Sequence, residues 1–471
     1  MSTGSHVVLF NSPRINEKRD VLEMEGVYPR IGIASIAAFL KQRGIRVSIL
    51  DPQIESLSRL GRIDYIHRKV KELQPDIVGI PAFTEEIYES ALVAKIVKEV
   101  DPHSLIVVGG PHPSAMQDQV LQEFQWFDVA VVGEGELTMA EIADGASLDR
   151  VAGIAYRQNT KIKMNPARAP IVSLDNLPKP AWELYNLNAY RGTSLSSGFK
   201  KKTNILELPI EGARGCPFAC NFCFRITGPN LRVISPERIV DEMERDIDEF
   251  HADTLFFVEG TFGANKKHGL AVCNEIIKRG LNEKITWSTG ARVDTVDEEL
   301  LTIMKKAGCS FIGFGVESGD SKILKSVGKY IHPEQSIAAF RLSKKLGIRT
   351  EANFILGHPG ETYQSVMKTI KLAKKLEADE ANFAILVPFP GTPIYEMASA
   401  EIGDIRIKTR DWRLYGKQLG EALDHKTLSS KTLAHLQAKA YREFYLRWSR
   451  FPNLLKKITI KRIIRELRRM V

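Results

Sequence analysis

Residues 212–223 read GARGCPFACNFC and hold three of the five cysteines in the chain. Cys216, Cys220 and Cys223 directly follow a predicted strand, so they lie in the loop at its C-terminal end. Thiolates are soft ligands that suit iron–sulfur clusters and zinc. Structural zinc takes four protein ligands, but the next candidate, His251, lies beyond a predicted helix. The spacing favours a 4Fe–4S cluster with one open iron, and a zinc knuckle with a distant ligand stays open as an alternative.

The chain from residue 203 onward alternates predicted strands with predicted helices. Strands are expected at 206–210, 254–258, 285–289, 311–316, 350–356 and 382–387. Helices are expected between them, at 236–250, 266–279, 298–306, 335–346 and 363–376. Six such units predict a partial (β/α)6 barrel of the TIM type over 203–400 rather than a closed eight-stranded barrel. Barrels of this kind carry their sites at the C-terminal ends of the strands, which is where the cysteines lie.

The first 150 residues show the same alternation and predict a doubly wound, Rossmann-like α/β domain. Strands are expected at 6–10, 46–50, 76–81, 105–108 and 129–132, and helices at 31–43, 63–73, 87–100 and 120–124. Residues 151–202 are rich in proline and are expected to form an extended linker over the surface. Residues 401–471 are expected to form a C-terminal helical region, with a helix at 429–445.

With its CxxxCxxC spacing and the aromatic Phe222 before the third cysteine, the chain resembles the radical S-adenosylmethionine (SAM) superfamily over roughly residues 203–395. The resemblance implies that Cys216, Cys220 and Cys223 bind a 4Fe–4S cluster whose open iron chelates SAM. In that family one electron from the cluster cleaves SAM to methionine and a 5′-deoxyadenosyl radical, which abstracts hydrogen from the substrate.

Further SAM contacts are expected at the ends of later strands, where the resemblance places them. Glu259 is the candidate for the SAM amino group. Arg292 either faces the SAM carboxylate or pairs with Asp294, and both alternatives stay open. The segment GFGVESG, residues 313–319, is similar to the family's GIESG segment. There Glu317, followed by Ser318, is the candidate for a ribose hydroxyl.

The N-terminal domain resembles the cobalamin-binding domain that is fused to radical SAM barrels. The matching pieces include VVGGPH at 107–112 and VVGEGE at 131–136. The resemblance implies a pocket for the nucleotide tail and the corrin, formed by Thr84, Gly109, Gly110, His112, Gly133, Glu134 and Gly135. The loop after the first strand reads NSPRIN and lacks the DxHxxG motif, so cobalamin is expected to bind without a histidine from this loop. A domain that has lost its ligand stays open as an alternative, and the missing GxGxxG disfavours a dinucleotide fold.

The two resemblances together predict a cobalamin-dependent radical SAM enzyme, most simply a C-methyltransferase in which methylcobalamin donates the methyl group. One SAM would methylate the cobalt and another would supply the radical. Two alternatives stay open. One is a relative that uses the same cofactors for oxidative cyclisation or rearrangement, and the other is an iron–sulfur or zinc binding module without catalysis. The expected partners are a small-molecule substrate and an electron donor such as flavodoxin or ferredoxin.

The net charge of +9 is concentrated in residues 447–471, which hold nine Lys or Arg and one Glu. A basic amphipathic helix here would lie on an anionic membrane, where the substrate would be lipid-like, or pack on the barrel with its charged face in water. Nucleic acid is disfavoured because no other basic patch accompanies the tail. With no signal peptide and no long apolar run, we expect a cytoplasmic protein, or one peripheral at the inner face of the membrane. Cys273 and Cys309 stand alone and are expected to be packing residues.

Overall fold

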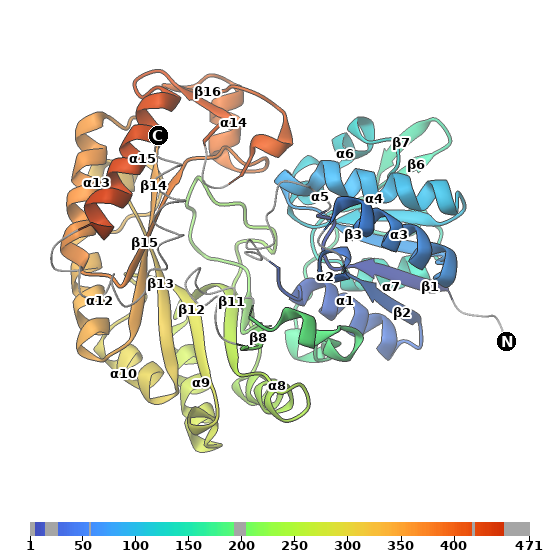
Figure 1. The fold of residues 1–471 in the computed structure, drawn as a ribbon, viewed down its shortest axis with the longest axis horizontal. Helices are drawn as coiled ribbons and strands as arrows, with labels where there is room; N and C mark the ends of the chain where they lie inside the picture. Colours follow the sequence, from blue (N-terminus) through green and yellow to red (C-terminus); the bar gives the residue numbers. More distant parts are fainter. Residues whose placement is uncertain (1–4, 15–26, 56–57, 193–203, 417–419, 447–471) are drawn as a thin grey trace.

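The computed structural model describes residues 5–14, 27–55, 58–192, 204–416 and 420–446. Two separate sheets dominate the chain, a mainly parallel one in the N-terminal part and a fully parallel one in the middle. Figure 1 shows them side by side, with the light-green segment that follows the first barrel strand between them. The loops at the strand ends of one sheet therefore lie near those of the other.

The N-terminal sheet has the strand order β2-β1-β3-β4-β5-β6-β7, in which the first five strands are parallel. These strands are β1 (His6–Phe10), β2 (Arg46–Leu50), β3 (Ile77–Pro81), β4 (Leu105–Gly109) and β5 (Val129–Val131). The helices are α1 (Ile31–Gln42), α2 (Pro52–Glu55), α3 (Arg59–Leu73), α4 (Ile87–Val100), α5 (Pro111–Met116), α6 (Asp118–Glu123) and α7 (Glu136–Ala143). Alternate side chains of β1 enter two different apolar clusters, one with α3 and α4 and one with α1 and α7. Helices on both faces bury the sheet, which confirms the doubly wound fold.

The segment predicted to be an extended linker is more ordered than expected. Strands β6 (Ile154–Gln158) and β7 (Lys161–Met164) form an antiparallel hairpin that extends the first sheet beyond residue 150. Short 3-10 turns follow, and Trp182 and Tyr190 are almost fully buried. The Tyr190 hydroxyl donates a hydrogen bond of 2.6 Å to Asp51 at the end of β2. Proline content correctly excluded long elements, but the aromatic side chains among the prolines supply enough apolar surface to pack inward.

The second sheet has the order β15-β14-β13-β12-β11-β8, and every pairing is parallel. Its strands are β8 (Glu207–Ile210), β11 (Thr254–Phe262), β12 (Thr286–Arg292), β13 (Cys309–Glu317), β14 (Arg349–Leu356) and β15 (Glu380–Ile385). The helices between them are α8 (Pro236–Asp248), α9 (Lys266–Lys278), α10 (Glu298–Lys306), α11 (Ser321–Ser326), α12 (Pro333–Lys345) and α13 (Tyr363–Leu376). The six-stranded partial barrel is confirmed.

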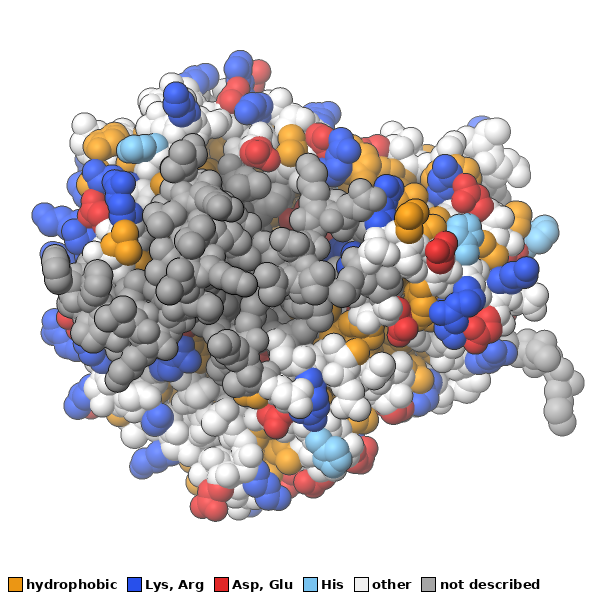
Figure 2. Space-filling model, in the orientation of Figure 1, with side chains coloured by type: hydrophobic (Ala, Val, Ile, Leu, Met, Phe, Trp, Pro, Cys, Tyr) orange, Lys and Arg blue, Asp and Glu red, His pale blue; other side chains and the backbone are white. Residues whose placement is uncertain are grey.

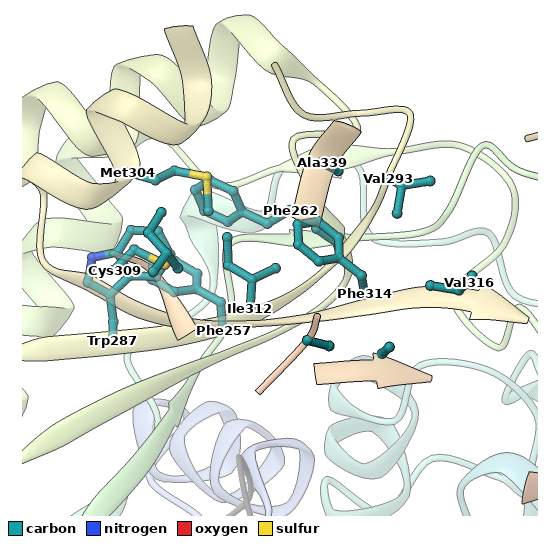
Figure 3. Close-up of a cluster of buried hydrophobic side chains, with 14 of the residues drawn as sticks. Phe257, Phe262, Trp287, Val293, Met304, Cys309, Ile312, Phe314, Val316 and Ala339 are labelled. Carbon is teal, nitrogen blue, oxygen red and sulfur yellow. The ribbon is translucent and has the colours of Figure 1, made fainter. Parts of the chain in front are cut away.

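The core of the barrel lies between the sheet and its outer helices. Figure 3 shows aromatic rings from neighbouring strands packed together, among them Phe257, Trp287 and Phe314. The Trp287 indole nitrogen donates to the carbonyl of Ala307 at 2.7 Å, so its one polar atom is satisfied. Cys309 belongs to this cluster, and Cys273 is equally buried on α9. The prediction that the two lone cysteines are packing residues is confirmed.

The C-terminal region is not purely helical. It contains α14 (Pro393–Ser399), an antiparallel pair formed by β16 (Ile405–Ile407) and β17 (Leu423–His425), and α15 (Ser430–Tyr445), which packs against β15. Between β16 and β17, Trp412 crosses to the N-terminal domain, where its indole nitrogen donates to Glu123 at 2.8 Å. The region therefore ties the two sheets together.

The surface of the barrel carries the expected charged layer. Figure 2 shows Lys and Arg side chains gathered along the left rim, over the barrel helices, and both signs mixed around the N-terminal domain. A helix that buries one face presents such a polar face to water. No helix in the described residues is long and apolar enough to cross a membrane. The prediction for 447–471 lies outside the described residues.

Candidate active site

A small hairpin carries the cysteine loop. Strand β9 (Ala213–Arg214) pairs antiparallel with β10 (Arg232–Val233), and the loop between them holds the three cysteines. Gly215 has φ +90°, and a Cβ there would lie 2.1 Å from the carbonyl oxygen of Asn230. The Gly215 amide donates to the Thr227 hydroxyl at 2.9 Å, and the Cys216 amide donates to the Gly228 carbonyl at 3.2 Å. Only glycine fits this entry to the loop, so the cysteines start from a fixed point.

The three thiols sit in a partly exposed, positively charged setting. Cys216 and Cys220 are half-buried and Cys223 is exposed. Burial raises the pKa of Cys220, although Lys329 and Arg292 act in the opposite direction. A metal that binds here would displace the thiol protons. In the described part of the chain no three His, Cys, Asp or Glu side chains are placed to hold a single metal ion, and a 4Fe–4S cluster places its thiolates on different iron atoms.

Arg292, at the end of β12, takes one of its two predicted roles. Its guanidinium donates two hydrogen bonds to Asp294, at 2.9 and 2.8 Å, and a third to the Lys329 carbonyl at 2.7 Å. It lies over the Phe218 ring at 3.9 Å, with one nitrogen 3.5 Å from the Cys220 sulfur. The arginine therefore holds the cysteine loop against the barrel, as a guanidinium can when it stacks and forms hydrogen bonds together.

Glu259 lies in β11 where the strand register breaks, between Phe257 and Phe262. Its carboxylate rests against the backbone of Gly212, where an added Cβ would be 3.1 Å from the carboxylate oxygen. Burial and the neighbouring Glu211 raise the pKa of Glu259 to about 8. Among the described residues, Glu211 is the one charged group that acts on the pKa of this carboxyl. A half-buried carboxylate of this kind is stabilised in its charged form by a cation or a hydrogen-bond donor.

Glu317 ends β13 in a left-handed conformation, with φ +64°. Such a conformation is costly for a residue other than glycine and recurs at functional sites. Its carboxylate accepts a hydrogen bond of 2.6 Å from the Lys329 ammonium over the face of Gly315, where a Cβ would collide with both groups. The next residue, Ser318, is fully buried, and its hydroxyl lies 3.2 Å from that of Thr369 on α13. Lys329 contacts this site but was not predicted from the sequence, because no motif surrounds it.

Two further polar side chains at the end of β14 were not predicted individually. His358 is fully buried, its ring lies 5.6 Å from the Phe222 ring, and both ring nitrogens lack a partner in the described residues. Burial lowers the pKa of His358 to about 3, so the ring is neutral. Glu361 accepts a hydrogen bond from the Gly357 amide at 2.6 Å, but its other oxygen has no described partner. These two residues could have been predicted from the sequence, because a histidine and a glutamate stand in a Gly/Pro turn at the end of a barrel strand.

The predicted cobalamin residues gather at the C-terminal edge of the first sheet. Thr84 follows β3, and its hydroxyl lies 3.3 Å from a ring nitrogen of His112 on α5. The other ring nitrogen of His112 has no partner among the described residues, and the Trp412 ring packs on the imidazole at 5.0 Å. Gly110, with φ +105°, touches Ala82 too closely for a side chain.

The loop after β5 divides into open glycine backbone and engaged carboxylates. Gly133 has φ +88° and open space where a Cβ would stand, whereas a Cβ on Gly135 would lie 2.8 Å from Ile36. The Glu134 carboxylate accepts hydrogen bonds from Arg232, and the Glu136 carboxylate accepts one from Arg214. Because both carboxylates already have arginine partners, a ligand at this loop would contact the glycine backbone and not the acidic side chains.

Two family models match the chain: the radical SAM superfamily over residues 210–373 and the B12 binding domain over residues 18–143. An uncharacterized methyltransferase of Pyrococcus horikoshii is 34% identical over 455 residues, which is 94% of each chain. The anaerobic magnesium-protoporphyrin IX monomethyl ester cyclase of Rubrivivax gelatinosus is 31% identical over 455 residues, covering 93% of this chain and 77% of the relative.

Solved structures share the architecture. The radical SAM methyltransferase TsrM from Kitasatospora setae, with cobalamin and a [4Fe-4S] cluster bound, matches with a TM-score of 0.69 and 18% identity over 92% of this chain and 81% of that chain. The cobalamin-dependent radical enzyme OxsB matches with a TM-score of 0.72 and 19% identity over 99% and 71%. At these identities the likeness concerns the fold.

Proposed function

Because this chain belongs to the radical SAM enzymes that carry an N-terminal cobalamin-binding domain, we propose that it is a C-methyltransferase that acts on a small molecule. The cofactors of this family are a 4Fe–4S cluster, SAM and cobalamin. When bound, they supply a carbon radical and a methyl group. The observation that carries the proposal is the contact between the cysteine hairpin and the loop after β5, through which the two cofactor regions lie against each other.

The residues at the barrel edge fit the groups that they would hold. Cys216, Cys220 and Cys223 are free thiols on one loop, beside the cations Arg292 and Lys329, which offset the negative charge of a thiolate cluster. Within the described residues no cation lies beside the carboxyl of Glu259, so this carboxyl can accept a hydrogen bond from the SAM amino group. The neutral imidazole of His358 can accept one hydrogen bond and donate another.

At the edge of the first sheet, the predicted cobalamin contacts are Thr84, Gly109, Gly110, His112, Gly133, Glu134 and Gly135. Because the Glu134 carboxylate accepts hydrogen bonds from Arg232, we propose that Glu134 contributes its backbone. In the described part of the loop after β1, Asn11 is held by Asp51 at 2.6 Å and Arg14 by Glu86, so these side chains serve the fold. No histidine stands there. We therefore expect cobalamin to bind without a histidine from this loop.

A second candidate function is ring formation or rearrangement with the same cofactors. It is supported by the relative from Rubrivivax gelatinosus, whose name is that of a cyclase and which matches 93% of this chain. The two candidates share every residue argued above, because both need a substrate radical. They differ in the fate of that radical, which is set by the substrate and its placement.

The experiment that tests the proposal uses the full chain, purified without oxygen and reconstituted with iron, sulfide and cobalamin. It is incubated with a reductant and with SAM that carries a labelled methyl group. We expect 5′-deoxyadenosine and S-adenosylhomocysteine, and in the presence of substrate a labelled product. Absence of 5′-deoxyadenosine refutes the radical function. Both SAM products with an unlabelled, oxidised product would favour the second candidate over methyl transfer.

The partners and location are also part of the proposal. A one-electron donor such as flavodoxin or ferredoxin would reduce the cluster in the cytoplasm. The basic segment 447–471 would bring the enzyme to an anionic membrane and its substrate would be lipid-like. Sedimentation with anionic vesicles tests this, and membrane binding that is unchanged on deletion of 447–471 would refute the role of the tail.

A further inference from the structure

Two arginines of the β9–β10 hairpin reach the loop after β5 of the first sheet. Arg232 donates to both oxygens of Glu134, at 2.6 and 3.1 Å. Arg214 donates to Glu136 at 2.7 Å. The four side chains are between 4% and 12% exposed. We call these two ion pairs the hairpin clamp. They join segments that lie 78 and 98 residues apart in the sequence.

On the hairpin side, the clamp acts next to the first cysteine. Arg214 and Arg232 are opposite each other in the β9–β10 pairing. Arg232 also donates to the Thr227 carbonyl at 2.9 Å, and the Thr227 hydroxyl accepts from Gly215, the residue before Cys216. A displacement of either arginine is therefore transmitted directly to the start of the cysteine loop.

On the sheet side, both carboxylates are held by their own domain. Glu134 accepts a hydrogen bond of 2.8 Å from the Ile171 amide, and Glu136 accepts one of 3.0 Å from the Ser35 hydroxyl on α1. Each carboxylate thus has a second hydrogen-bond partner besides its arginine. The Arg232–Glu134 pair is bidentate, which defines an angle as well as a distance.

Buried ion pairs contribute little net stability compared with apolar packing, and their best supported role is to specify one arrangement. We propose that Glu134, Glu136, Arg214 and Arg232 are positioning residues, which set the cysteine loop at a fixed distance and angle from the cobalamin-binding sheet. The inference rests on the proposed function, because it concerns the path between SAM on the cysteine loop and cobalamin on the sheet.

The two fates of SAM depend differently on this arrangement. Reductive cleavage of SAM to methionine and the 5′-deoxyadenosyl radical consumes one electron and takes place within the barrel. The radical becomes 5′-deoxyadenosine when it takes a hydrogen atom from the substrate or, without substrate, from the reductant or buffer. In methyl transfer the methyl group leaves sulfur, takes the electron pair for its new bond from reduced cobalamin, and leaves S-adenosylhomocysteine behind. This second reaction spans both domains. A loosened clamp therefore lowers the formation of S-adenosylhomocysteine while the formation of 5′-deoxyadenosine continues.

The test compares Arg232→Gln, Arg232→Lys and the control Glu141→Gln. The control breaks another bidentate pair, Arg168–Glu141, which lies within the N-terminal part of the chain and is more exposed, with 14% and 41% of the two side chains accessible. Each full-length protein is loaded with cluster and cobalamin, reduced with titanium citrate and given SAM without substrate. Both nucleoside products are then quantified. Deuterium uptake of peptides from 211–233 is measured on the same samples.

For Arg232→Gln we expect a loss of about 100-fold in S-adenosylhomocysteine, as misplacement by about 1 Å can cause, with 5′-deoxyadenosine within about twofold of the unaltered protein. Arg232→Lys keeps the charge but not the fork, so its loss should be smaller, and deuterium uptake over 211–233 should rise in the same order. Equal losses of both products, or an unchanged product ratio in a variant with normal iron and cobalamin content, would overturn the positioning role. If the unaltered protein forms neither product, the proposed function itself fails, which is a separate outcome.

Discussion

At the strand ends of the first sheet, Glu86 accepts hydrogen bonds from Arg14 and Arg30, whereas at the strand ends of the barrel Glu259 has no cation beside it among the described residues. Burial alone would raise the pKa of both carboxyls. The two arginines instead lower the pKa of Glu86 to about 2, while that of Glu259 rises to about 8. In the first sheet, arginine side chains of the protein neutralise the Glu86 carboxylate. At the barrel edge, the Glu259 carboxyl is left for a ligand to contact. Such unmatched groups mark functional sites.

The largest expected effect concerns the thiols of the barrel edge. Cys220→Ala removes one of three proposed cluster ligands, so iron content, visible absorbance and 5′-deoxyadenosine should fall to the level of a protein that was not reconstituted, while bound cobalamin is retained. Cys273→Ala, which alters only the core of the barrel, should keep its iron. Retention of a full cluster by the Cys220 variant would show that the ligands lie elsewhere.

The next effect concerns the unmatched carboxyl. Glu259→Gln should weaken SAM binding by about 10- to 100-fold, because a charge-assisted hydrogen bond contributes about 1.5–3 kcal/mol. In the unaltered protein SAM affinity should fall as the pH drops below about 8, since the Glu259 carboxyl must lose its proton to meet the ligand cation. The variant should lose this dependence, as isothermal titration would measure.

A carboxyl elsewhere on the same sheet provides the control for that experiment. Glu351 lies early in β14, and burial raises its pKa to about 6. Glu351→Gln should leave SAM affinity unchanged. If Glu351→Gln lowers SAM affinity as much as Glu259→Gln does, the loss results from the changed net charge near the sheet and not from a contact between Glu259 and SAM.

The matched carboxyl of the first sheet should affect stability instead. Glu86→Gln leaves Arg14 and Arg30 without their shared partner and should lower the free energy of unfolding by about 3 kcal/mol at pH 7. Because the folded pKa is lowered, this stabilisation is complete above about pH 4.5 and is lost as the pH falls toward 2. The difference between the two proteins should therefore shrink at pH 3 in urea denaturation. Glu85→Gln, at a half-exposed neighbour of Arg14, should cost less than about 1 kcal/mol.

The smallest effect comes from replacing glycines of the first sheet. It distinguishes the steric exclusion of a ligand from the conformational cost of a left-handed backbone. Gly133 and Gly145 have φ +88° and +82°, and both have open space around a Cβ. Alanine at either position should cost about 1–2 kcal/mol for the left-handed backbone. Only Gly133→Ala should also weaken cobalamin binding, measured by retention on gel filtration. Equal cobalamin binding by both variants would remove Gly133 from the site.

The sequence was sufficient for the parts of the molecule that depend on local periodicity and spacing. Alternation of strands and helices predicted both sheets, and the parallel sheet edge then placed Glu259, Arg292 and Glu317 near the cysteines. Strand ends were less certain: β11 runs to Phe262 and β12 to Arg292, beyond the predicted 258 and 289. The residues at the strand ends that face the site are polar, so the apolar alternation stops before the strand does. A prediction based on that alternation therefore ends the strand too early.

Long-range pairings were not accessible in the same way. The partner of Glu134 is Arg232, and nothing in either local sequence distinguishes that arginine from the others in the chain. The same holds for Lys329, which reaches Glu317 from the turn after α11. The hairpin β6–β7 was overlooked because proline content dominated the neighbouring segment. Each of these depends on what the folded chain brings together, and a single sequence holds no record of it.

Trp412 and Glu123 form a hydrogen bond although 289 residues separate them. During synthesis at about 5–20 residues per second, the first sheet, which ends at Met164, is complete roughly 12–50 s before Trp412 is made. Throughout that interval His112 on α5 lacks the Trp412 ring that packs against it in the folded protein. The order of synthesis thus leaves this edge of the first sheet uncovered by Trp412 until the segment between β16 and β17 has been made. A ligand as large as cobalamin has access to the edge during that time.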